Sequence, residues 1–187
     1  MQVMMGLLDM GIGATLIRKF ANPKSDITEV KYKNDLLRTI EVFYWGVSIV
    51  LFLAILFLSD WLGSNFLNSK IYTHAQVIQI IKLIGLALAF QLPCGVYLSC
   101  LSGLQIHSKM NVIQILGTIC RHTLGILILI LKGDLILFFI VQVFLSFFQT
   151  AISRFIIWNI IKQKRMSNPE FKISILNNIW RFSVGMA

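Results

Sequence analysis

Residues 111–131, NVIQILGTICRHTLGILILIL, form an apolar stretch with one arginine, Arg121, near its centre. A helix rises about 1.5 Å per residue, so about 20 residues cross the hydrocarbon core of a bilayer. An arginine at that depth costs about 2.5 to 3.5 kcal/mol, so its side chain is expected to face a protein interior or a watery cavity. Gln114, Thr118 and Arg121 recur at steps of four and three, which places them on one helical face. The stretch predicts a membrane helix that forms one wall of a polar cavity.

The composition of the chain is that of a membrane protein. Hydrophobic residues make up 57% of the 187 residues and charged residues only 13%, whereas soluble proteins carry about 25% charged residues. The net charge of +9 does not indicate nucleic acid binding, because the basic residues cluster between apolar runs, where they set orientation. Cys94, Cys100 and Cys120 lie inside apolar runs and are predicted to be small buried hydrophobic residues. No metal-ligand spacing, serine–histidine–acid set or glycine-rich phosphate loop occurs, so neither a cofactor nor an enzymatic activity is predicted.

The apolar runs predict an all-α fold, a polytopic transmembrane helix bundle in a single domain covering residues 1–187. About five crossings and a partial sixth are expected. Both end segments are apolar but too short to cross a bilayer, so the chain is expected to be a fragment of a longer protein. The predicted helices are 42–59, 83–106, 111–131 and 135–157, with partial helices at 1–17 and 176–187.

A second polar stripe runs along 135–157, where Gln142, Ser146, Gln149 and Ser153 recur at steps of four, three and four. Only three residues, 132–134, separate this helix from 111–131. Two antiparallel neighbours with polar faces are expected to look into one cavity. In 83–106, Pro93 predicts a kink, and the small residues at 95, 99 and 103 favour close helix packing over a ligand role.

The ionisable residues inside apolar segments have two interpretations each. Asp9 is a candidate for ion coupling, or it pairs structurally with Arg18. His122 is favoured as a hydrogen-bonded core residue, although its titration range permits a coupling role. Arg121 either pairs with a carboxylate on a neighbouring helix or binds a phosphate that passes through the cavity. The glutamines and serines of the two stripes are suited to hydrogen-bonding sugar hydroxyls.

The distribution of lysine and arginine predicts the orientation of the chain. The connections 18–41, 107–110 and 158–175 carry most of the basic residues, and the alternate connections carry only Lys70, Lys82 and Lys132. Since basic loops stay on the inner side, the three richer connections are predicted to be cytoplasmic.

Four stretches together resemble the bacterial oligosaccharide flippases. The resemblance is to the O-antigen and capsule-type polysaccharide exporters of the multidrug, oligosaccharidyl-lipid and polysaccharide exporter superfamily, and it runs along the chain in the order of the family. The stretches are LLDMGIGATLIRKFA at 7–21, GLQIHSKMNVIQILGTICRHTLGILILIL at 103–131, FFIVQVFLSFFQT at 138–150 and IWRFSVGMA at 179–187.

The resemblance implies a two-lobed exporter of the bacterial inner membrane, of which this chain would form part of the N-terminal lobe. Such proteins flip undecaprenyl-pyrophosphate-linked oligosaccharide from the cytoplasmic to the outer leaflet for surface polysaccharide and lipopolysaccharide biosynthesis. Expected partners are the lipid-linked oligosaccharide, membrane lipid and other polysaccharide assembly proteins. Arg121 is the first candidate for the pyrophosphate and Arg18 the second, with Gln114, Thr118, Gln142, Ser146 and Gln149 as further cavity residues.

Three other functions stay open at this point. One is an ion-coupled multidrug exporter of the same superfamily, and another is a non-catalytic assembly subunit or a non-functional fragment. A membrane-embedded glycosyltransferase or acyltransferase is disfavoured, because no acidic or histidine residues stand out in a catalytic arrangement at a membrane face.

Overall fold

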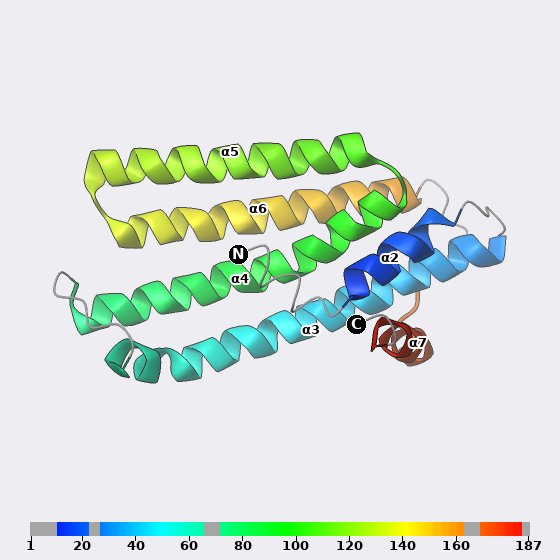
Figure 1. Ribbon diagram of the computed structural model, residues 1–187, viewed down its shortest axis with the longest axis horizontal. Coiled ribbons are helices and arrows are strands. Elements are labelled where there is room, and N and C mark those ends of the chain that lie inside the picture. The colour runs from blue at the N-terminus through cyan, green and yellow to red at the C-terminus, as the bar shows by residue number, and fades with distance from the viewer. Residues whose placement is uncertain (1–10, 23–26, 66–71, 163–168, 185–187) are drawn as a thin grey trace.

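The computed structural model describes residues 11–22, 27–65, 72–162 and 169–184, and within these ranges the protein is an all-α helical bundle without strands (Figure 1). Four of the described helices, α3 to α6, are long and apolar enough to cross a membrane, which makes this a membrane protein. The predicted end segments 1–17 and 176–187 both extend into residues outside the described ranges. The helices are α2 (Ile12–Ala21), α3 (Ile27–Asn65), α4 (His74–Gly103), α5 (His107–Lys132), α6 (Leu135–Lys162) and α7 (Ile173–Val184).

The four long helices are antiparallel along the chain, and α4 is the central one, packed against α3 and α6 over most of its length (Figure 1). Helix α5 packs mainly against α6 and makes few contacts with α4, while α2 packs against α4. The apolar core gathers at one end of the bundle, where the first half of α3, the second half of α4 and the last turns of α6 meet α2 and α7. Its most buried members include Leu16, Phe20, Leu36, Leu37, Ile40, Val96, Tyr97, Leu101, Ile157 and Ile179.

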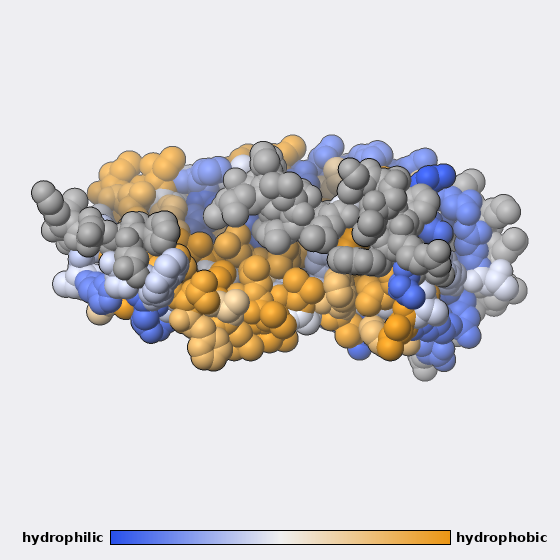
Figure 2. Space-filling model, turned by 60° about the horizontal axis from the view of Figure 1, so that its bottom comes forward, coloured by the Kyte–Doolittle hydropathy of each residue, from blue (hydrophilic) through white to orange (hydrophobic). Residues whose placement is uncertain are grey.

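Charged residues mark where the hydrocarbon would begin and end. In α3, roughly 19 residues separate Glu41 from Asp60, which is about 28 Å of helix. In α5, Arg121 lies roughly midway between Lys109 and Lys132. Large hydrophobic side chains between these levels are exposed on α3, α5 and α6, as expected for surfaces that contact lipid. Figure 2 shows one such face, with hydrophobic residues gathered in the middle and hydrophilic ones toward the ends.

The predicted polar loop at 18–41 is wrong. Helix α2 continues to Ala21, and α3 begins at Ile27 and runs for 39 residues, about 58 Å. Asn22 between them is extended, as expected for a residue that precedes a proline. Likewise, 107–110 belongs to α5, and 158–175 contains the end of α6 and the start of α7. Charged residues mark where a helix leaves the hydrocarbon. They do not mark where the helix ends, because a helix whose polar side chains are hydrogen-bonded can extend into water.

The part of α3 outside the hydrocarbon holds the segment that leads into α7. Asp35 and Thr39 are buried, and both accept hydrogen bonds from backbone N–H groups of that segment: Glu170 N to Asp35 at 2.9 Å and Lys172 N to Thr39 at 3.0 Å. The Lys172 ammonium pairs with Asp35 at 2.6 Å, and this hydrogen bond raises the pKa of Lys172. The contacts fix α7 against α3 through polar groups as well as through its apolar face.

The small residues at 95, 99 and 103 of α4, which are predicted from the sequence to pack closely, have two different roles. A Cβ at Gly103 would lie 2.7 Å from the backbone oxygen of Ile17, so this glycine permits close packing with α2. A Cβ at Gly95 would meet no atom of the described residues within 4 Å, and Gly95 and Ser99 line a cavity among these residues instead. The expectation of packing is wrong for these two. Cys94 and Cys100 are buried, but Cys120 is exposed, because its face of α5 meets no other described helix.

Replacement of Gly103 by alanine is expected to lower the free energy of unfolding by about 1 to 3 kcal/mol, because α2 must move away from α4. Gly95→Ala is the matched control on the same helix, and it is expected to be neutral or stabilising by up to about 1 kcal/mol. Unfolding in mixed micelles of increasing dodecyl sulfate content, followed by tryptophan fluorescence, measures both. Equal effects of the two variants would contradict the close α2–α4 contact.

Candidate functional site

Arg121 lies mid-way along α5 and reaches across to α6. Its Nη2 donates to Ser146 Oγ at 3.3 Å and to Gln149 Oε1 at 3.1 Å, and Gln142 Nε2 donates to the Arg121 carbonyl at 3.1 Å. The structure therefore brings the two polar stripes face to face. Gly117 makes room for this contact, since a Cβ there would lie 2.9 Å from the Gln149 side chain.

The guanidinium of Arg121 has no carboxylate within 4 Å among the described residues, whose ion pairs all involve Asp35, Glu41 or Glu170. Its Nε is buried and has no hydrogen-bond partner there. Neutral oxygens thus hold the cation in place without cancelling its charge. The alternative of a structural ion pair on a neighbouring described helix does not hold, while Asp9 lies outside the described residues.

A cavity of about 690 Å³ opens between α4 and α5, and Arg121 and Gln149 are among the residues that line it. The volume is within the range of small-molecule sites. Gln114 and Thr118 face it from α5, whereas Ser99 and Ser102 face it from α4. The groove thus combines hydroxyl and amide groups with one cation that has no carboxylate partner in the described part of the chain. We call it the Arg121 groove.

A smaller cavity of about 260 Å³ lies on the other side of Arg121 and is lined mostly by apolar side chains, including Phe138 and Phe139. Gln142 and His122 line this cavity and not the Arg121 groove, and His122 is exposed. Members of both stripes line each of these two cavities, so the expectation of one shared cavity holds for Gln114, Thr118 and Gln149 but is wrong for Gln142. Arg121 contributes to both.

Helix α4 supplies a second layer of polar contacts that the sequence did not indicate. Gln91 Nε2 donates to Ser146 Oγ at 3.3 Å, so Ser146 lies between Gln91 and Arg121. Thr150 Oγ1 donates to the Phe90 carbonyl at 2.7 Å, next to the turn of α4 that contains Pro93. Pro93 has no N–H to donate to the carbonyl of Ala89, four residues before it, and the carbonyl that Thr150 reaches, that of Phe90, is the next one in the same turn. Ser153 contacts Cys94 at 3.7 Å and does not reach the Arg121 groove.

Arg18, the second candidate for the pyrophosphate, lies apart from Arg121. It is exposed in the last turn of α2 and does not line the Arg121 groove, to which α2 contributes Ile17. Since the polar face of α2 points away from α4, the structure does not bring the two arginines together.

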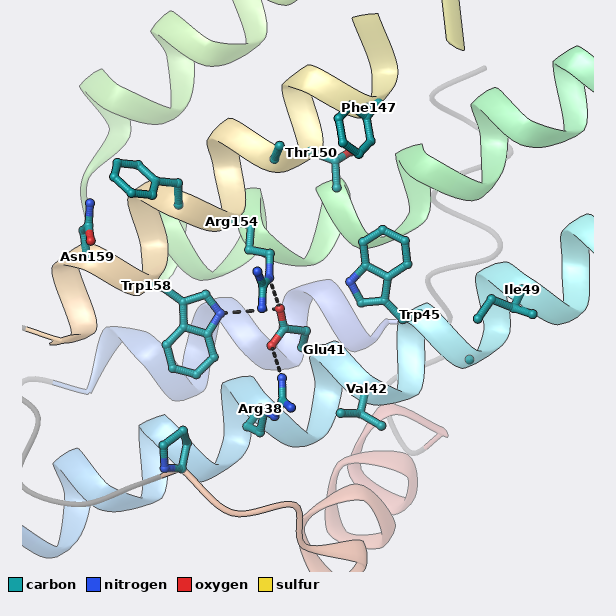
Figure 3. A pocket seen from close by; sticks show the side chains of 14 residues that line it. Arg38, Glu41, Val42, Trp45, Ile49, Phe147, Thr150, Arg154, Trp158 and Asn159 are labelled. Carbon is teal, nitrogen blue, oxygen red and sulfur yellow. Dashed lines mark hydrogen bonds and ion pairs between the residues drawn. The ribbon is translucent and has the colours of Figure 1, made fainter. Parts of the chain in front are cut away.

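A second charged cluster, which sequence reasoning missed, surrounds Glu41 (Figure 3). Glu41 Oε1 accepts hydrogen bonds from Tyr97 Oη at 2.8 Å, Arg154 Nε at 2.5 Å and Trp158 Nε1 at 3.5 Å. Its Oε2 accepts from Arg38 at 3.2 Å. The carboxylate side chain is only 2% exposed, whereas those of Arg38 and Arg154 are 43% and 50% exposed. The cluster joins α3, α4 and α6.

The sequence contained one signal for this cluster. Arg154 is the only charged residue between Asp134 and Lys162, so it required a partner or an interface. That partner is 113 residues away in the chain. No spacing rule connects the two residues.

The comparisons with known proteins give no match: no protein-family model, no curated protein and no solved structure corresponds to this chain.

Proposed function

We propose that this chain acts in the transport of a lipid-linked oligosaccharide, of the undecaprenyl-pyrophosphate type, from the cytoplasmic to the outer leaflet of a bacterial inner membrane. The observation that carries the proposal is the Arg121 guanidinium, which lies midway along a helix long and apolar enough to cross a membrane and has no carboxylate partner among the described residues. A cation in that position is costly unless an anion or water meets it.

The donor groups of Arg121 suit a phosphate. Among the described residues, both side-chain hydrogen bonds of Arg121 use Nη2, so the other terminal nitrogen of the guanidinium keeps donor capacity for a ligand in the groove that Arg121 lines. The buried Nε is not accessible to a ligand. Arginine binds phosphate with several directed hydrogen bonds, and a low-dielectric surrounding strengthens them. Ser146 and Gln149 orient the guanidinium but leave its charge available.

The rest of the Arg121 groove suits the sugar part of such a substrate. Gln114, Thr118, Ser99 and Ser102 are neutral hydrogen-bonding groups that line the same groove. Hydroxyls and amides donate and accept hydrogen bonds without binding a charge tightly, so a transported glycan can exchange partners as it moves. Both parts of the proposed substrate therefore have chemical counterparts in one groove.

Reconstitution in vesicles tests the proposal. The protein is incorporated into phosphatidylcholine vesicles that hold a fluorescent pyrophosphate-linked oligosaccharide lipid, and a membrane-impermeant reductant bleaches the label in the outer leaflet. Vesicles with protein are expected to lose nearly all fluorescence, because the inner-leaflet lipid is brought out, whereas protein-free vesicles lose about half. Retention of half of the signal in both samples, at equal protein incorporation, would reject the proposal.

A multidrug exporter is the second candidate, and the smaller cavity with Phe138 and Phe139 is the observation in its favour. Arg121 also lines that cavity and would repel the lipophilic cations that many exporters carry. Accumulation of a lipophilic cationic dye by the same vesicles, together with no movement of the oligosaccharide lipid, would favour the exporter.

A further inference from the structure

A further cavity of about 1130 Å³ lies between α3 and α6, at a different place from the Arg121 groove. Figure 3 shows Arg38, Glu41 and Arg154 at its centre, flanked by Trp45 and Trp158. The proposed transport of oligosaccharide does not use this cavity. Apolar side chains continue its wall along both helices: Val42, Ile49, Phe147 and Phe155.

The charges of the cavity do not cancel. Two arginines surround one carboxylate, which leaves a net positive charge of one on this cluster. Glu41 is nearly inaccessible, and the half-exposed Arg38 and Arg154 present the charge to the outside. The cavity therefore offers a cationic surface with the anion hidden behind it.

The cavity lies at the boundary of the hydrocarbon and extends inward from it. Glu41 and Arg154 are the charged residues that end the apolar segments of α3 and α6, and tryptophans are typical of this level of a membrane. Along the helix axis, Ile49 lies roughly 12 Å from Glu41 on α3, and Phe147 lies roughly 10 Å from Arg154 on α6. Both lie toward the middle of the bilayer. Charge at the interface and an apolar wall below it match the two parts of a phospholipid.

We infer that this cavity binds an anionic phospholipid, with the phosphate between Arg38 and Arg154 and an acyl chain along the wall that runs toward Ile49 and Phe147. Basic pockets between membrane helices are suited to anionic headgroups. A free phosphate would leave the apolar wall without a ligand, and a zwitterionic lipid would bring an ammonium group toward the arginines. The site is independent of the Arg121 groove, so it can hold whether or not the proposed transport does.

Quenching by brominated lipid measures the occupancy. The protein carries Trp61→Phe and Trp180→Phe, so that Trp45 and Trp158 give the signal, and it is placed in phosphatidylcholine vesicles. Brominated phosphatidylglycerol is expected to quench these tryptophans at about one fifth of the concentration that brominated phosphatidylcholine requires, the factor for about 1 kcal/mol per cation. Arg38→Gln should abolish this preference, because Arg154 and Glu41 then neutralise each other. Arg38→Lys should keep most of it.

Two further variants make the test specific. Lys109→Gln removes the same charge at the same end of the bundle but outside the cavity, and it should keep the fivefold preference. Asn159→Glu adds a carboxylate to the cavity lining, leaves the Glu41 ion pairs in place and should abolish the preference. Equal quenching by the two lipids in the unmodified cavity would overturn the assignment. The assignment would also be overturned if Lys109→Gln and Arg38→Gln lost the preference for phosphatidylglycerol to the same extent. Stronger competition by undecaprenyl phosphate than by phosphatidylglycerol would overturn it as well.

Discussion

Vesicles with the Arg121→Ala variant are expected to move the oligosaccharide lipid roughly 10- to 150-fold more slowly than vesicles with the original protein. The factor corresponds to about 1.5 to 3 kcal/mol for hydrogen bonds from a charged donor to the passing phosphate. Arg121→Lys keeps the charge but loses the planar donor set, so its rate is expected to lie between the two. Bleaching by the impermeant reductant, at matched protein incorporation, gives all three rates.

Stability separates the transport role of Arg121 from a packing role. Because the cation lacks a carboxylate among the described residues, Arg121→Leu is expected to leave the free energy of unfolding unchanged or to raise it. Lys109→Ala is the charge-matched control on the same helix and should change neither rate nor stability. A destabilised Arg121→Leu variant, or an Arg121→Ala variant that transports at the original rate, would contradict the role proposed for this residue.

Removal of the Glu41 carboxylate is expected to be among the most destabilising single changes in the described part of the chain. In Glu41→Ala the buried Tyr97 hydroxyl loses its acceptor and two arginines lose the anion between them. The free energy of unfolding should fall by about 2 to 4 kcal/mol, which allows for the half-exposed arginines. Unfolding followed by the fluorescence of Trp45 and Trp158 measures this change where it occurs.

Two variants test whether the loss comes from the cluster. Glu29→Ala removes the same group from the first turn of the same helix, where an acidic residue is worth only about 0.3 to 1 kcal/mol. Glu41→Gln keeps an oxygen acceptor for Tyr97, so its loss in free energy of unfolding should lie between those of Glu29→Ala and Glu41→Ala. If Glu29→Ala and Glu41→Ala had the same small effect, the network around Glu41 would not be stabilising.

The all-α fold and the positions of α5 and α6 could be predicted from the sequence, because apolar runs of about 20 residues with so little charge are typical of helices that cross a bilayer. The start of α4 could not, since this helix begins at His74, nine residues before the predicted residue 83. The length of α3 could not. Its first part is polar, and hydropathy reports which residues cross lipid, not where the backbone stops being helical. Asp35 and Thr39 are compatible with that helix because they bond a segment more than 130 residues away.

The meeting of Arg121 with Ser146 and Gln149 follows from local rules. The period of the helix placed each set on one face, and the short turn at 132–134 made the two helices neighbours. The cluster of Glu41, Tyr97 and Arg154 depends on how α3, α4 and α6 pack, and no local rule specifies that. The open space at Gly95 was missed for the same reason, because a row of small residues predicts closeness only when another helix lies over it.

The spacing of Glu41 and Asp60 has a consequence for the choice of membrane. The roughly 28 Å between them is the hydrophobic thickness that α3 can match without tilting. A thicker bilayer would draw Glu41 and its two arginines into acyl chains, so α3 would have to lean or the lipid would have to thin around it. Hydrophobic mismatch would then act first on the Glu41 cluster, and bilayers of long-chain or sterol-rich lipid should be poor hosts for this protein.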